Sequence, residues 1–89
     1  MMARAFVYTE TDNSPESPRK GKPIYTIHYN EHFNGGCSKI QSPDEDFFKA
    51  EIANARRKNN VTLVSKLPPK IQPVEGAIER RPYDLSSLK

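Results

Sequence analysis

The sequence predicts a small α+β domain: a short antiparallel sheet with one helix packed on its apolar face, followed by a proline-rich extended tail. Three features predict it: alternating apolar and polar residues at 24–33, an Asn-Gly pair directly after them, and an amphipathic segment at 43–58. Period-two alternation is typical of a half-buried strand, and a period near 3.6 is typical of a surface helix. We therefore expect the order β-β-β-α-β over residues 1–67, and the extended tail over residues 68–89.

The first strand is expected at residues 4–9, where aromatic and β-branched residues dominate. Residues 10–23 then contain three prolines and a glycine, and they predict a long, mobile loop. The second half of this loop is basic, with Arg19, Lys20 and Lys22.

The segment 24–33 predicts the second strand of an antiparallel sheet with one face in water. The Asn-Gly pair after it is typical of a two-residue type I′ turn, because both residues tolerate a positive φ. Such a turn places Phe33 opposite Gly36 and Tyr29 opposite Ile40. Ile40 then lies on the apolar face of the return strand, so the register and the hydrophobic pattern agree.

The polar face of this hairpin is a candidate site for a small ligand or an anion. It carries His28, Asn30, His32, Cys37 and Lys39. Histidines four residues apart on a strand are separated by about 13 Å, too far to share one metal ion, so we expect no metal site. Cysteine and histidine meet across the turn, but nucleophilic catalysis also needs an orienting group and an oxyanion site. We therefore expect no enzymatic activity and no cofactor.

A helix is expected over about 43–58. Ser42 can serve as the N-cap, and Glu45 completes a capping box with it. Apolar residues recur at helical spacing and predict one buried stripe, Phe48, Ile52 and Ala55. The helix ends on the basic residues Arg56, Arg57 and Lys58.

The last strand is expected at 61–67, before two prolines that cannot donate to a ladder. The apolar residues of the tail are spaced too widely for a core, so we expect an extended segment that docks on a protein partner. Its candidate anchors are Arg80, Arg81, Pro82, Tyr83 and Leu85, since tyrosine and arginine are common at the centres of interfaces. A disordered or self-packed tail is the alternative.

The net charge of +3 is mildly basic, and acidic and basic residues are interspersed. The basic residues that could track nucleic acid or an anion are Arg19, Lys20, Lys22, Arg56, Arg57 and Lys58, provided that they converge on one face. At the end of a helix, basic residues are equally explained by the helix dipole.

Cys37 is the single cysteine, so an intramolecular disulfide is excluded. The sequence shows neither a bilayer-spanning apolar run nor a signal peptide, and we expect a cytoplasmic chain without a membrane segment. We interpret it as a non-enzymatic accessory protein, of a size that suits a phage protein or a complex subunit. It would bind another protein, or a second copy of itself, through the sheet edge or face, the long loop and the tail. Nucleic-acid binding and small-ligand binding stay open as alternatives.

Overall fold

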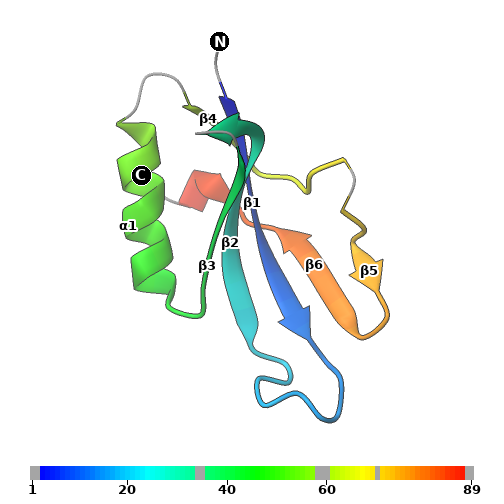
Figure 1. Cartoon of the computed structure of the whole chain (residues 1–89). Helices are drawn as coiled ribbons and strands as arrows, with labels where there is room; N and C mark the ends of the chain where they lie inside the picture. The colour runs from blue at the N-terminus through cyan, green and yellow to red at the C-terminus, as the bar shows by residue number, and fades with distance from the viewer. Residues whose placement is uncertain (1–2, 34–35, 58–60, 70, 88–89) are drawn as a thin grey trace.

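The computed structural model describes residues 3–33, 36–57, 61–69 and 71–87 and has the α+β class that the sequence predicts (Figure 1). Its elements are β1 (Ala3–Asp12), β2 (Pro23–Phe33), β3 (Gly36–Ser42), α1 (Glu45–Arg56), β4 (Val61–Val64), β5 (Val74–Glu75), β6 (Ile78–Pro82) and the 3-10 helix η1 (Leu85–Ser87).

The strands form one sheet in the order β3-β2-β1-β6-β5, and β4 also pairs with β1. One edge of β1 is therefore shared by two strands. β4 runs parallel to the stretch Ala3–Phe6, and β6 runs antiparallel to the stretch Tyr8–Asp12. This sharing places β1 at the centre of the sheet, with β3 at one end of the strand order (Figure 1).

The β2–β3 hairpin differs from the expected register. Phe33 faces Gly36 as predicted, but Ile40 faces Ile27 and not Tyr29. The register shifts between the pairs at His28 and His32, so that four residue steps of β2 lie against two of β3. Such a bulge lengthens one strand locally. Because the offset is an even number of residues, Ile40 still lies on the apolar face.

The core lies between α1 and one face of the sheet. Buried apolar residues of this core are Ala5 and Val7 of β1, Ile27 and Tyr29 of β2, and Phe48 and Ile52 of α1. Alternate residues of each strand point to this face. The helical stripe is buried as the sequence predicts, including Ala55.

The prediction that Ser42 caps α1 is wrong. The N-cap is Asp44, whose carboxylate accepts hydrogen bonds from the backbone N–H groups of Asp46 (2.9 Å) and Phe47 (3.4 Å). A charged carboxylate satisfies two donors at the positive end of the helix dipole, which favours it over a hydroxyl. Ser42 instead accepts the N–H of Asp44, at 3.0 Å.

The expectation that residues 68–89 form an extended tail is wrong for its described second half. β5 and β6 form a hairpin that joins the free half-edge of β1, with Gly76 at a φ of +61° in its turn. Beyond β6, the N–H of Tyr83 donates to the carbonyl of Val7 at 3.0 Å, and Tyr83 and Leu85 pack against the core. Backbone pairing with β1 satisfies the backbone polar groups of β6, so the segment stays on the sheet with few apolar residues.

The connection between β1 and β2 spans residues 13–22 and is shorter than expected, since both strands continue into it. Asn13 donates its N–H to the carbonyl of Ala77 at 2.9 Å, which ties the loop to the β5–β6 turn. Gly21 has a φ of +77°, a conformation that favours glycine.

Candidate functional site

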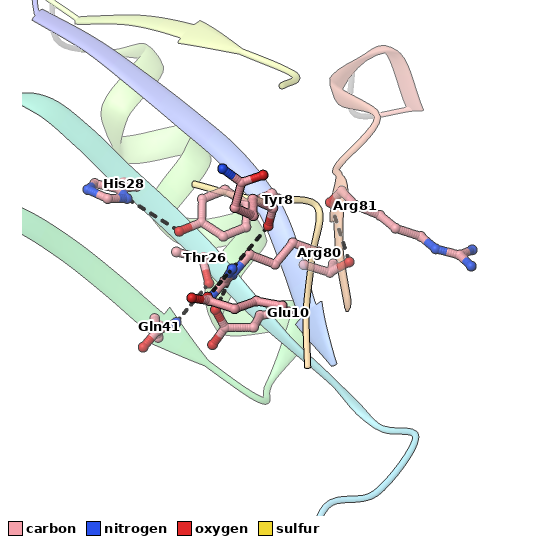
Figure 2. A network of polar contacts seen from close by, with 10 residues as sticks. Tyr8, Glu10, Thr26, His28, Gln41, Arg80 and Arg81 are labelled. Carbon is pink, nitrogen blue, oxygen red and sulfur yellow. Dashed lines mark hydrogen bonds and ion pairs between the residues drawn. The ribbon is translucent and has the colours of Figure 1, made fainter. Parts of the chain in front are cut away.

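The polar face that the sequence singles out is the sheet face turned away from α1. There the Tyr8 hydroxyl lies 3.3 Å from Nδ1 of His28, and Nε2 of Gln41 donates to Oγ1 of Thr26 at 3.1 Å (Figure 2). Tyr8 and Thr26 are fully buried. The hydroxyl groups of Tyr8 and Thr26 are therefore engaged within the chain, whereas Gln41 on the same face is exposed.

The lowered pKa of His28 disfavours this residue as a ligand for an anion. Burial lowers the pKa of His28, and the neighbouring charge of Lys39 lowers the pKa further. Lys39 faces His28 in the β2–β3 register and is itself exposed. A neutral imidazole carries no charge with which to attract an anion. The remaining predicted members of this face, Asn30, His32 and Cys37, have side chains outside those that the structure describes.

Arg80 forms the centre of an ion-pair cluster beside this network. Its Nε donates to Oε2 of Glu10 at 2.7 Å, and its Nη1 donates to Oε1 of Glu75 and to the carbonyl of Gln72, both at 3.0 Å (Figure 2). The Arg80 side chain is 11% exposed, and its bond to Glu10 raises its pKa. Its guanidinium is thus occupied by groups of its own chain.

The predicted tail anchors are divided by the structure. Arg81 points away from the cluster (Figure 2). Its side chain is 77% exposed and pairs with Glu79. Pro82 is also exposed. Tyr83 and Leu85 are half-buried against the core, and the Tyr83 hydroxyl donates to Oε2 of Glu45 at 3.0 Å. Of the five predicted anchors, two are therefore exposed.

The predicted basic residues do not converge. Arg19, Lys20 and Lys22 lie in the β1–β2 loop, whereas Arg56 and Arg57 lie at the end of α1, and Figure 1 shows these two places at opposite ends of the molecule. Lys58 lies outside the described residues. The known positions thus do not form one continuous basic surface of the kind that tracks a phosphate backbone.

The described residues contain no cluster of three His, Cys, Asp or Glu side chains that could hold a metal ion. Within the same part of the chain, no helix is long and apolar enough to cross a membrane.

An open strand edge is the remaining feature with binding potential. β3 has seven residues and, among the described strands, pairs with β2 alone. The next element, α1, packs on the sheet and contacts β2, β3 and β4. The sequence predicts an exposed edge in general, but not which strand provides it, because the strand order depends on pairings far apart in the chain.

Phe47 is exposed on the flank of α1 that points away from η1. It is 45% exposed, and Val74 of β5, at 66%, is the other exposed large apolar residue among those described. Arg56 lies nine residues after Phe47 on α1, and its guanidinium donates to the carbonyl of Leu85 in η1 at 3.5 Å. Nine residues make about two and a half turns, so Phe47 lies on the opposite flank from Arg56. The helical periodicity of the sequence indicates that Phe47 is exposed, because Phe47 lies about 100° around the helix from the buried Phe48.

Comparisons of the chain with family models, with curated proteins and with solved structures give no match.

Proposed function

We propose that this chain is a non-enzymatic interaction protein that binds a polypeptide through the outer edge of β3 and the adjoining flank of α1. We name this surface the β3–α1 edge and define it as the backbone edge of β3 with Phe47 and Asn54 of α1. These two side chains are seven residues apart, so they share one flank of the helix.

The open edge of β3 is the observation that carries the proposal. An edge strand presents unpaired N–H and C=O groups, to which an extended segment can add as a further strand. The other strands at the sheet margin are shorter, with four residues in β4 and two in β5. β3 therefore offers the longest template for strand addition among the described strands.

The exposed ring of Phe47 supports the proposal. Strand addition takes its affinity from backbone hydrogen bonds and its specificity from neighbouring side-chain contacts. Phe47, at 45% exposure, supplies an apolar side chain on this flank of α1. The other prominent groups, Arg80 and the Tyr8–His28 pair, are already engaged within the chain.

The test uses a photo-crosslinking residue placed at Phe47 and, in a matched chain, at Val74. Any polypeptide captured at Phe47 is purified and titrated by calorimetry against the unmodified chain, the F47D variant and the V74D variant. We expect binding to weaken about tenfold or more in F47D and to stay unchanged in V74D. Equal effects of the two substitutions would place the binding surface elsewhere and contradict the proposal.

A further inference from the structure

We infer that the β3–α1 edge takes an extended segment of another protein whose side chains follow the order apolar, polar, basic, acidic. This inference rests on the proposed function, because it specifies the partner of the same surface. The segment adds to β3 as an antiparallel strand, since antiparallel pairs outnumber parallel ones about two- to threefold. Its side chains then point alternately to the α1 side and to the polar face of the sheet. β3 itself contains no acidic residue, so a second β3 strand does not have this order.

On the polar face, an added strand meets a positive charge. Lys39 and Gln41 of β3 lie on this face and are exposed. Among the residues that the structure describes, Lys39 has no ion-pair partner. Opposite charges on directly opposing residues of two strands attract, and like charges repel. The residue of the segment that lies opposite Lys39 is therefore acidic, and the residue opposite Gln41 is polar.

On the α1 side, the added strand meets a negative charge. Glu51 lies about one turn after Phe47 on the same flank of α1 and is half-buried. Burial raises the pKa of Tyr29, and the charge of Glu51 raises it further, so Glu51 lies close to β2, the strand that pairs with β3. No ion pair joins Glu51 to another residue in the described part of the chain. The basic Arg57 lies about 9 Å further along the helix and donates to Oδ1 of Asn54.

The order of the side chains follows from distances along β3 and α1. β3 runs toward the turn from which α1 runs back (Figure 1). From the end of β3 at Ser42, Ile40 lies about 7 Å back along the strand. From the start of α1 at Glu45, Phe47 lies about 3 Å and Glu51 about 9 Å along the helix. Because helical side chains lean toward the helix start, Phe47 is nearly level with Ser42, and Glu51 with Ile40.

A basic residue opposite Ile40 suits both of its neighbours. The aliphatic stem of a lysine covers the half-buried Ile40 while its ammonium is directed toward Glu51. The residue two positions earlier lies opposite Ser42, so an apolar side chain there covers the exposed ring of Phe47. The residue after the basic one lies opposite Lys39 and is acidic. From its N-terminus, the segment is therefore apolar, polar, basic, acidic.

The first experiment titrates the isotope-labelled full-length chain with two synthetic peptides and follows the backbone amide signals by NMR. The first peptide, acetyl-Val-Thr-Lys-Glu-Val-Thr-amide, has the inferred order. The second, acetyl-Val-Thr-Glu-Lys-Val-Thr-amide, has the same composition and net charge but meets Lys39 and Glu51 with like charges. We expect the first peptide to bind about tenfold more tightly at low salt, and this preference to shrink at high salt. Signals of β3 should shift, whereas those of β5 should not.

Two further peptides test whether the backbone of the segment pairs with β3. Both have the first sequence, with methyl groups on alternate amide nitrogens, one peptide at odd and the other at even residues. An added strand pairs through only one of these two sets, so one peptide should lose binding and the other should keep it. Equal affinities of the two methylated peptides would show that no strand is added, and they would overturn the inference.

The second experiment reverses the two charges on the chain. K39E and E51K should each reduce the preference for the first peptide, and the double variant K39E/E51K should prefer the second peptide. E51Q removes the charge without adding a new one, so it should reduce the preference even if E51K does not fold. R81E, an exposed charge reversal on β6, should leave the preference unchanged. Circular dichroism checks that each variant keeps its helix.

The outcomes separate this inference from the proposed function. No binding of either peptide, equal affinity for both, or a double variant that still prefers the first peptide overturns the inference. A dimer of the chain alone that F47D dissociates also overturns it, because a second copy then occupies the edge. If a polypeptide captured at Phe47 nevertheless loses affinity in F47D, the proposed function stands without the inferred order. If no peptide binds and no captured polypeptide depends on Phe47, both are wrong.

Discussion

Arg80 of β6 and Glu10 of β1 lie directly opposite each other in the sheet, and the guanidinium of Arg80 donates to the carboxylate of Glu10 over 2.7 Å. The same guanidinium reaches Glu75 of β5 and the carbonyl of Gln72. These contacts join residues that are up to seventy positions apart in the chain. One side chain thus adds to the backbone pairing that holds the β5–β6 hairpin on β1.

Replacing Arg80 by alanine should lower the free energy of unfolding by about 1–3 kcal/mol. The substitution leaves the half-buried carboxylate of Glu10 and the carbonyl of Gln72 without their donor, and unmade hydrogen bonds to charged groups cost this much. Urea unfolding followed by circular dichroism measures the change.

The neighbouring Arg81 provides the matched control for this prediction. It is also an ion-paired arginine, but its side chain is 77% exposed. R81A should change the free energy of unfolding by less than about 0.5 kcal/mol, because solvent screens an exposed pair. Equal losses in R80A and R81A would show that the Arg80 cluster does not fasten the hairpin.

Tyr83 should be essential to the domain although it lies near the end of the chain. Its ring is 4.9 Å from that of Phe48 and 6.0 Å from that of Tyr25, both in edge-on contact. Y83A should lower the free energy of unfolding by about 2–4 kcal/mol, because it removes a half-buried aromatic ring. Y83F keeps the ring and should lose about 1 kcal/mol through the hydrogen bond to Glu45. Similar losses in both variants would contradict a packing role for the ring.

The Tyr83 hydroxyl also predicts a pH dependence at alkaline pH. Burial, followed by the hydrogen bond to Glu45, raises the pKa of Tyr83 from 10.0 to about 12. Because the folded pKa lies above the unfolded one, the folded chain holds this proton more tightly. The corresponding stability is present below pH 10 and is lost as the pH rises through 12. Y83F should flatten this loss in unfolding curves measured across that range.

The sequence predicts the parts of this fold that depend on local pattern. The α1 stripe and the face of Ile40 follow from periods of 3.6 and 2, which neighbouring residues determine. The bulge in β2 does not follow, because an even offset leaves the hydrophobic pattern unchanged. For this reason the face of Ile40 is predicted correctly, whereas the residue of β2 that lies opposite Ile40 is not.

The β5–β6 hairpin and its contacts cannot be predicted from the local sequence pattern. Gly76 between Val74 and Ile78 is a turn signal, but two short strands are stable only because β1 offers half of one edge. That half-edge is open to β6 because the pairing of β4 with β1 ends at Phe6. This arrangement depends on the topology of the whole sheet. The role of Arg80, and the open edge of β3, depend on the same strand order and are visible only in three dimensions.

Asp44 should stabilise α1 more than Ser42 does. Its carboxylate accepts two backbone N–H groups at the start of the helix, whereas the Ser42 hydroxyl accepts one N–H outside it. D44A should therefore lower the free energy of unfolding by about 1 kcal/mol, and S42A by less. Chemical denaturation of the two variants measures this order. The reverse order would restore Ser42 as the capping residue.

Lys39 should control the protonation of His28. Burial first, and then the charge of Lys39, lower the pKa of His28 from its ordinary value of 6.5. Replacing Lys39 by methionine removes the charge and keeps a similar length of side chain, so the pKa of His28 should rise but stay below 6.5, because burial is unchanged. NMR titration of the imidazole signals measures the shift, with H32Q used to assign the two histidines.

The same substitution should alter the acid sensitivity of the fold. Because the pKa of His28 is lower in the folded chain, the unfolded chain binds more protons as the pH falls below 6.5. The stability linked to neutral His28 is therefore present above pH 6.5 and is lost as the pH falls through the folded pKa. K39M should reduce this loss, whereas K49M, on the surface of α1, should leave it unchanged. If K39M and K49M lose the same amount of stability at acid pH, the charge of Lys39 does not contribute to the difference between the folded and unfolded pKa of His28.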